Sequence, residues 1–73
     1  MKIQIESTTR VVNVNGMDCR VWEGATESGI EVQALIVRIA APDTADLRQF
    51  NAELKETKPP SAVVAAFPAR MII

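Results

Sequence analysis

The sequence predicts an α+β fold: an antiparallel meander of about four strands, one helix on one face of the sheet, and a returning C-terminal strand. Three observations lead to this prediction. Segments within residues 2–40 alternate apolar and polar residues, as half-buried strands do. An Asn15-Gly16 pair separates two of these segments, and residues 44–57 carry apolar residues at helical spacing. A chain of 73 residues is expected to form a single domain, residues 1–73.

The first part of the chain predicts a strand followed by a hairpin. Residues 2–7 alternate around Ile3 and Ile5. In residues 10–24 both members of the Asn15-Gly16 pair tolerate the positive φ of a type I′ turn, which predicts a tight hairpin there. The apolar residues on either side of this turn are Val12, Val14, Met17, Cys19 and Val21.

A second, looser turn is expected at residues 24–29, which begin and end with glycine. Residues 30–40 then form the next strand, and folding back through this turn is expected to bring Val21 opposite the region of Val32. That strand is apolar on both faces from Ala34 to Val37, which is typical of a strand that is central in its sheet or covered by another chain.

The helix is predicted over residues 44–57. Its apolar stripe consists of Leu47, Phe50 and Leu54, and Asp43 is expected to cap its first amides. The Pro59-Pro60 pair ends it.

The last residues leave two conformations open. Ser61 caps a short helical turn through Ala66, or residues 63–67 are extended. Arg70 to Ile73 are expected to form the returning strand, docked on the same sheet or on a neighbouring subunit.

The residue inventory argues against catalysis. The chain has no histidine and no tyrosine, and its serines lie without a base to activate them. Cys19 shares the apolar side of its strand with Met17 and Val21, so we interpret it as a small buried residue and not as a nucleophile. With one cysteine and no histidine, no metal site is expected. The sequence therefore predicts a protein that is not an enzyme and has no cofactor.

Charge and chain length restrict the partners. A net charge of −1, from eight basic and nine acidic residues, disfavours general nucleic-acid binding. The sequence has no apolar run long enough for a membrane span, and a lone cysteine fits a reducing compartment, so a cytoplasmic protein is expected. A domain of this size buries only about 60% of its unfolded surface, which favours a homo-oligomer.

Four residues are candidates for ligand binding: Arg20, Trp22, Arg38 and Arg70. Arg38 follows an apolar run, so we expect it to be buried and paired. One interpretation is a structural ion pair with Glu6, Glu23 or a helix carboxylate. The other is a guanidinium that binds an anionic ligand stacked on Trp22.

The stretches RVWEGATESGI, ELKETKPP and FPARMII resemble short accessory proteins of bacteriophages and prophages. The resemblance implies a phage protein that acts in the cytoplasm of a bacterial host cell. The first hypothesis is a non-enzymatic oligomeric binding protein that sequesters a small anionic, nucleotide-like signal in counter-defence. The alternative is an inhibitor that blocks a host defence protein by direct contact, through an exposed sheet edge or the charged side of the helix.

Overall fold

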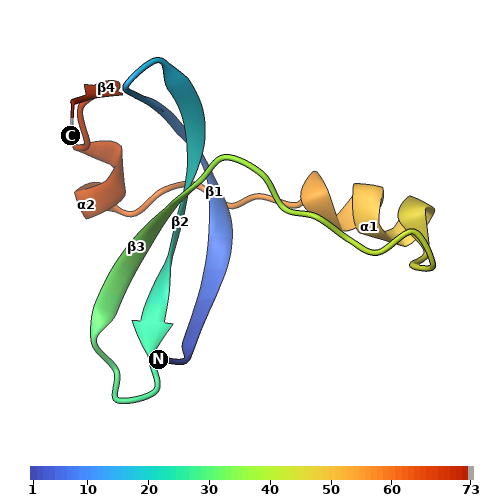
Figure 1. Ribbon diagram of the computed structural model, residues 1–73. Coiled ribbons are helices and arrows are strands. Elements are labelled where there is room, and N and C mark those ends of the chain that lie inside the picture. The colour runs from blue at the N-terminus through green and yellow to red at the C-terminus, as the bar shows by residue number, and fades with distance from the viewer. Residues whose placement is uncertain (73) are drawn as a thin grey trace.

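In the computed structural model, which describes residues 1–72, the chain forms a mixed sheet with two short helices (Figure 1). The elements are β1 (Ile3–Val14), β2 (Met17–Thr26), β3 (Glu31–Ile36), α1 (Leu47–Leu54), α2 (Ala62–Ala65) and β4 (Arg70–Met71). The sheet order is β3-β2-β1-β4, with β1 to β3 antiparallel and β4 parallel to β1. The α+β class is confirmed, whereas the strictly antiparallel meander is wrong.

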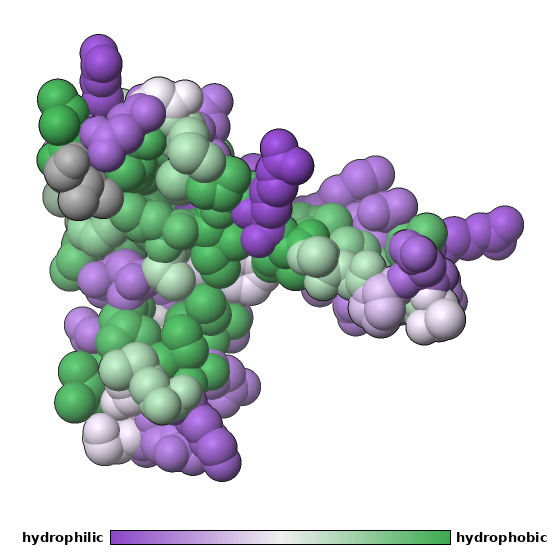
Figure 2. Space-filling view, viewed as in Figure 1, coloured by the Kyte–Doolittle hydropathy of each residue, from purple (hydrophilic) through white to green (hydrophobic). Residues whose placement is uncertain are grey.

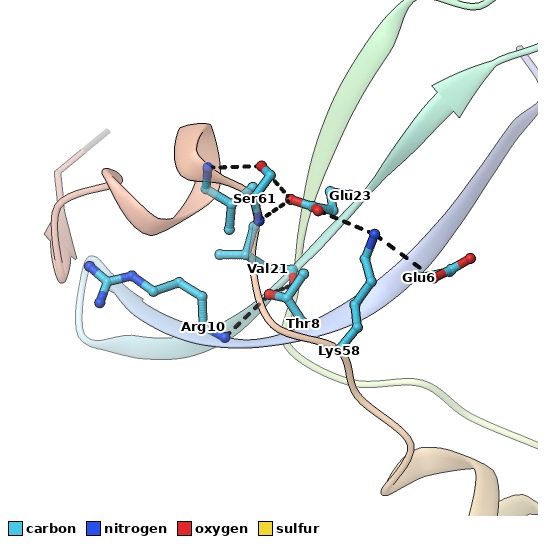
Figure 3. Close-up of polar contacts among 8 residues, drawn as sticks. Glu6, Thr8, Arg10, Val21, Glu23, Lys58 and Ser61 are labelled. Atoms are coloured by element: carbon cyan, nitrogen blue, oxygen red, sulfur yellow. Dashed lines mark hydrogen bonds and ion pairs between the residues drawn. The ribbon is translucent and has the colours of Figure 1, made fainter.

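β1 joins two segments that were expected to be separate strands. Its register with β2 shifts between Ser7 and Val11. At this irregularity the hydroxyl of the fully buried Thr8 donates to the Val21 carbonyl at 2.6 Å and accepts from the Arg10 amide at 3.2 Å (Figure 3). The side chain thus satisfies backbone groups that lose their ladder partners, and the chain continues as one strand.

The first turn forms as predicted. Asn15 and Gly16 have φ values of 50° and 89°, the two positive values that a type I′ turn requires. The Gly16 amide also donates to the side-chain oxygen of Asn13 at 2.9 Å. This local sequence signal therefore fixes the β1–β2 hairpin.

The second turn is shorter than expected, because Gly24 lies inside β2 and not in the turn. Gly24 pairs with Ile5 on one side and Val32 on the other. A Cβ on Gly24 would lie 1.9 Å from the Gln4 carbonyl oxygen, so the close approach of β1 requires a glycine here. The turn itself uses Gly29, whose φ is 88° and whose amide donates to the Thr26 carbonyl at 3.0 Å.

The register of β3 also differs from the expectation. Val21 lies opposite Leu35, three residues from the expected Val32, and Trp22 lies opposite Ala34. Because the shift is an odd number of residues, it moves the side of β3 that carries Ala34 to the same face as Trp22. β3 ends at Ile36, so the rest of the predicted strand lies outside the sheet.

The core lies between one face of the sheet and α2. Its buried members are Val12, Cys19, Val21 and Val64, and partly buried Val14, Leu35, Phe67 and Met71 pack against them. The Ser61 hydroxyl caps α2 by accepting from the Val64 amide at 3.4 Å. The helical alternative for this segment is therefore confirmed, and so is the interpretation of Cys19 as a small buried residue.

α1 does not pack on the sheet, so that prediction is wrong. None of its residues is buried, and it projects from the sheet on the side opposite α2 (Figure 1). The short α2 covers the face that the longer helix was expected to cover. α1 also begins later than expected, because Asp46 and not Asp43 is its N-cap and accepts from the Arg48 and Gln49 amides at 3.1 Å.

The returning C-terminal strand pairs within its own chain. The Asn13 amide donates to the Ala69 carbonyl at 2.7 Å, and the Asn15 amide donates to the Met71 carbonyl at 3.1 Å. The strand was predicted to extend to Ile73, which lies outside the described residues.

Candidate functional site

The face of the sheet opposite α2 is covered only in part: Ile3 and Val11 are exposed, and its other apolar residues are half-buried. Directly paired residues of antiparallel strands point to the same side, so the register places Trp22, Ala34 and Ile36 together on this face. Residues of β1 join them through their partners on β2. We call this surface the open face; its members, which are apolar apart from Arg20 and the buried Ser7, are Ile3, Ile5, Ser7, Val11, Arg20, Trp22, Val32, Ala34 and Ile36. Arg20 and Trp22 share a face, as the sequence indicated.

Trp22 lies in a groove between the open face and the end of α1. The groove has a volume of about 350 Å³. The residues that line it are Ile5, Glu6, Ser7, Trp22, Glu53, Glu56, Thr57 and Lys58. The Ser7 hydroxyl donates to the Glu56 carbonyl at 2.6 Å and ties this end of the helical segment to the sheet. Its lining therefore includes two large apolar residues, three glutamates and one lysine.

Arg20 has a structural partner. Its Nη1 donates to the Thr8 carbonyl at 2.8 Å, at the irregularity in β1. A charged donor to a carbonyl that has left the ladder stabilises the bulge, in the same way as the Thr8 hydroxyl does. The half-buried guanidinium is thus engaged by the backbone, although its other N–H groups are not used in this contact.

Arg38 and Arg70 lie at opposite edges of the sheet. Arg38 follows the end of β3 and is exposed, so the expectation that it is buried is wrong. Arg70 is exposed on β4, opposite Asn13 of β1. β3 and β4 are the two edges of the sheet, about 14 Å apart at ordinary strand spacing. One chain does not bring the three arginines to one site.

A polar cluster that the sequence did not predict joins the returning chain to the sheet. Lys58 Nζ lies 3.2 Å from Glu23 Oε1 and 3.8 Å from Glu6 Oε2, and Glu23 Oε2 accepts from the Ser61 hydroxyl at 2.9 Å (Figure 3). The backbone of Lys58 donates to the Ser7 carbonyl at 3.1 Å and accepts from the Thr9 amide at 3.0 Å. Glu23 was considered as a partner for Arg38, but its cation is Lys58. Nothing in the local sequence around Lys58 and Ser61 indicates that these residues contact Glu23.

These contacts change the pKa of Glu23. Partial burial, with 13% of the side chain exposed, raises its pKa, but the hydrogen bonds from Ser61 and Lys58 together lower it below the ordinary value of 4.5. A carboxylate with a lowered pKa stabilises the fold above its unfolded pKa, and this contribution disappears as the pH falls through the folded pKa.

We therefore expect Glu23→Gln to lower the free energy of unfolding at pH 7. The difference from the wild type should shrink as the pH falls below about 4.5, because both chains then carry an uncharged group at this position. Urea unfolding at a series of pH values measures this difference. Glu31→Gln removes an exposed carboxylate of β3 and serves as the control. A difference for Glu23→Gln that stays constant with pH would contradict the role assigned to the Lys58 and Ser61 contacts.

A second hollow lies at the end of the β1–β2 hairpin that is away from the Asn15-Gly16 turn. It has a volume of about 590 Å³ and includes the carboxylates of Glu6, Glu23 and Glu27. Each of these has a lysine within 4 Å: Lys58 for the first two, and Lys2 for Glu27 at 3.9 Å. Within residues 1–72 no group of histidine, cysteine and acidic side chains could hold a metal ion. Neither hollow is lined by Arg20, Arg38 or Arg70.

Comparison with protein-family models, curated proteins and solved structures finds no match to this chain. In the part of the chain that the structure describes, no helix has the length and apolarity needed to cross a membrane. The geometry of the site is therefore the basis for a functional proposal.

Proposed function

We propose that this chain is a non-enzymatic binding protein that acts by direct protein–protein contact through the open face. The observation that carries the proposal is a half-exposed apolar sheet face with the chain's sole tryptophan on it. Contiguous exposed apolar surface on a small protein is typical of a contact site, and tryptophan is enriched among the residues that dominate binding energy.

The arrangement of charged residues around the open face favours protein–protein contact over the sequestering of an anionic signal. The residues that line the groove beside Trp22 include three glutamates and one lysine, a balance that disfavours a phosphate group. Arg20 already donates to the Thr8 carbonyl, and Arg38 and Arg70 lie at opposite edges of the sheet. A nucleotide site would need residues from more than one chain.

The phage resemblance implies that the protein acts inside a bacterial host cell. The partner would then be a protein present in the bacterial cytoplasm, either a host protein or a second copy of this chain. Apolar residues such as Ile5 and Ile36 would supply buried area around Trp22, and Arg20 and the groove carboxylates would supply polar contacts at the rim.

A photo-crosslinking amino acid at position 22 tests the proposal in bacterial cells. We expect a covalent protein adduct from position 22 and none from position 33, because Gln33 is exposed on the opposite face of the sheet. Thermal unfolding of the purified protein with nucleotides is the second measurement, and we expect no shift in Tm. The absence of an adduct together with a nucleotide-dependent rise in Tm would overturn the proposal in favour of sequestering.

A further inference from the structure

α1 packs little against the rest of the chain within residues 1–72. It has eight residues and none is buried; Leu47 and Leu54 are 52% and 42% exposed, and Phe50 is half-buried. Helices shorter than about 12 residues are marginal in water unless an apolar side packs against something. The Asp46 cap and a hydrogen bond from Gln49 to Glu53 at 3.3 Å are the local contacts that support it. Their small contribution indicates that α1 is stabilised by contact with another surface.

The dimensions of the chain also indicate a missing contact. Its accessible surface is 5619 Å², whereas a compact monomer of 8.0 kDa exposes about 4,450 Å². Its radius of gyration is 13.4 Å, against about 11 Å for a compact chain of this length. The excess surface, about 1,200 Å², is somewhat more than the roughly 800 Å² that each partner buries in a standard interface.

We propose that the missing contact is a second copy of this chain, with the apolar stripe of α1 in each copy packed on the open face of the other. The inference rests on the proposed function, since it names the partner of that same face. The stripe consists of Leu47, Phe50 and Leu54, which lie on one side of the helix at spacings of three and four residues.

A second copy fits because each chain offers both halves of the contact. An exchange of α1 about a two-fold axis covers two stripes and two open faces with one interface, which is the self-complementary arrangement of most dimers. Figure 2 shows apolar surface both on the body of the molecule and on the projecting arm that includes α1. The net charge of −1 on each chain gives little repulsion between copies.

The oligomeric state of the purified full-length chain tests the proposal. We expect light scattering after size-exclusion chromatography to give twice the chain mass of 8.0 kDa at micromolar concentration. The double variant Leu47→Glu/Leu54→Glu should give the monomer mass. Ala52→Glu is the matched control, because it adds a carboxylate to the opposite side of the same helix, and it should remain a dimer.

The double variant is informative only if its sheet is folded, and Trp22 fluorescence and circular dichroism check this. Because neither substituted residue is buried, we expect the sheet spectrum of the variant to match that of the wild type. A wild-type chain that is monomeric over the whole concentration range would overturn the proposal. A dimer that survives the double variant would also overturn it and would point to pairing through the exposed edge of β3.

Crosslinking identifies the surface that α1 contacts. A photo-crosslinking amino acid at position 50, in an equimolar mixture of isotope-labelled and unlabelled chains, should give mixed-label adducts to peptides of the open face. The same amino acid at position 52 should give none. A monomeric chain whose position 22 still crosslinks to another protein in cells would refute the dimer and leave the proposed function intact. A monomer with no adduct would refute both.

Discussion

Gly24→Ala is expected to destabilise the protein more than any other exchange of glycine for alanine in this chain. A Cβ at this position would lie 1.9 Å from the Gln4 carbonyl oxygen and 2.8 Å from the Ile5 Cα, which are both backbone atoms. Backbone atoms of a paired strand cannot turn aside as a flexible side chain does, so β1 and β2 must separate locally. Overpacking of this kind costs about 3 kcal/mol or more.

Such a loss is large for this protein. A domain of 73 residues has a total stability of about 4–11 kcal/mol, so Gly24→Ala should remove from about a quarter to three quarters of it. Urea unfolding followed by Trp22 fluorescence, at one fixed protein concentration, measures the change. Trp22 is a suitable probe because it lies on β2 two residues before Gly24.

Gly29→Ala is the control for the backbone preference of glycine. Gly29 has a φ of 88°, but a Cβ there would meet nothing within 4 Å. Its substitution should cost about 1–2 kcal/mol from the left-handed conformation alone. If the two variants lost equal stability, the contact between Gly24 and Gln4 would not be the cause, and strand separation would have to be rejected.

The sequence could predict the elements whose signals are local. The Asn15-Gly16 turn depends on adjacent residues and the Ser61 cap on nearby ones, and this cap was one of the two conformations that the sequence left open. The end of the helix was predicted less well, because α1 ends at Leu54 and does not continue to residue 57 before Pro59-Pro60. Gly24 shows the limit of such signals. A glycine near a turn and a glycine under a neighbouring strand look the same in one sequence, and the distinction depends on Gln4, twenty residues earlier.

The candidate site depended on longer-range information. The pair Arg20 and Trp22 could be placed on one face from their spacing alone. Their neighbours could not, because an odd shift of the β3 register exchanges its two faces and the turn length did not determine the register. The apolar stripe of α1 indicated that the helix packs against something, but not that α2 would take the covered face of the sheet. Lys58 and Glu23 are far apart in sequence, so their ion pair had no local signal.

Val64→Ala is expected to release the C-terminal segment from the sheet. Val64 is fully buried and is the contribution of α2 to the four-residue buried core. Its replacement by alanine removes the buried surface of two methyl groups and leaves a cavity against Val12 and Val21. We expect this to lower the free energy of unfolding by about 2–3 kcal/mol. Val63→Ala, next to it on α2, changes a residue that is 55% exposed and should alter stability by less than about 0.5 kcal/mol.

Hydrogen exchange distinguishes a local from a global effect of Val64→Ala. The amides of Asn13 and Asn15 donate to the carbonyls of Ala69 and Met71, so they report directly on the docking of β4. The β1–β2 and β2–β3 ladders do not depend on these bonds. We therefore expect faster exchange at Asn13 and Asn15 while the amides of the β2–β3 ladder stay protected, as in the opening of a small cooperative unit. Equal loss of protection across all strands would instead show that α2 and strands β1 to β3 unfold together in one cooperative step.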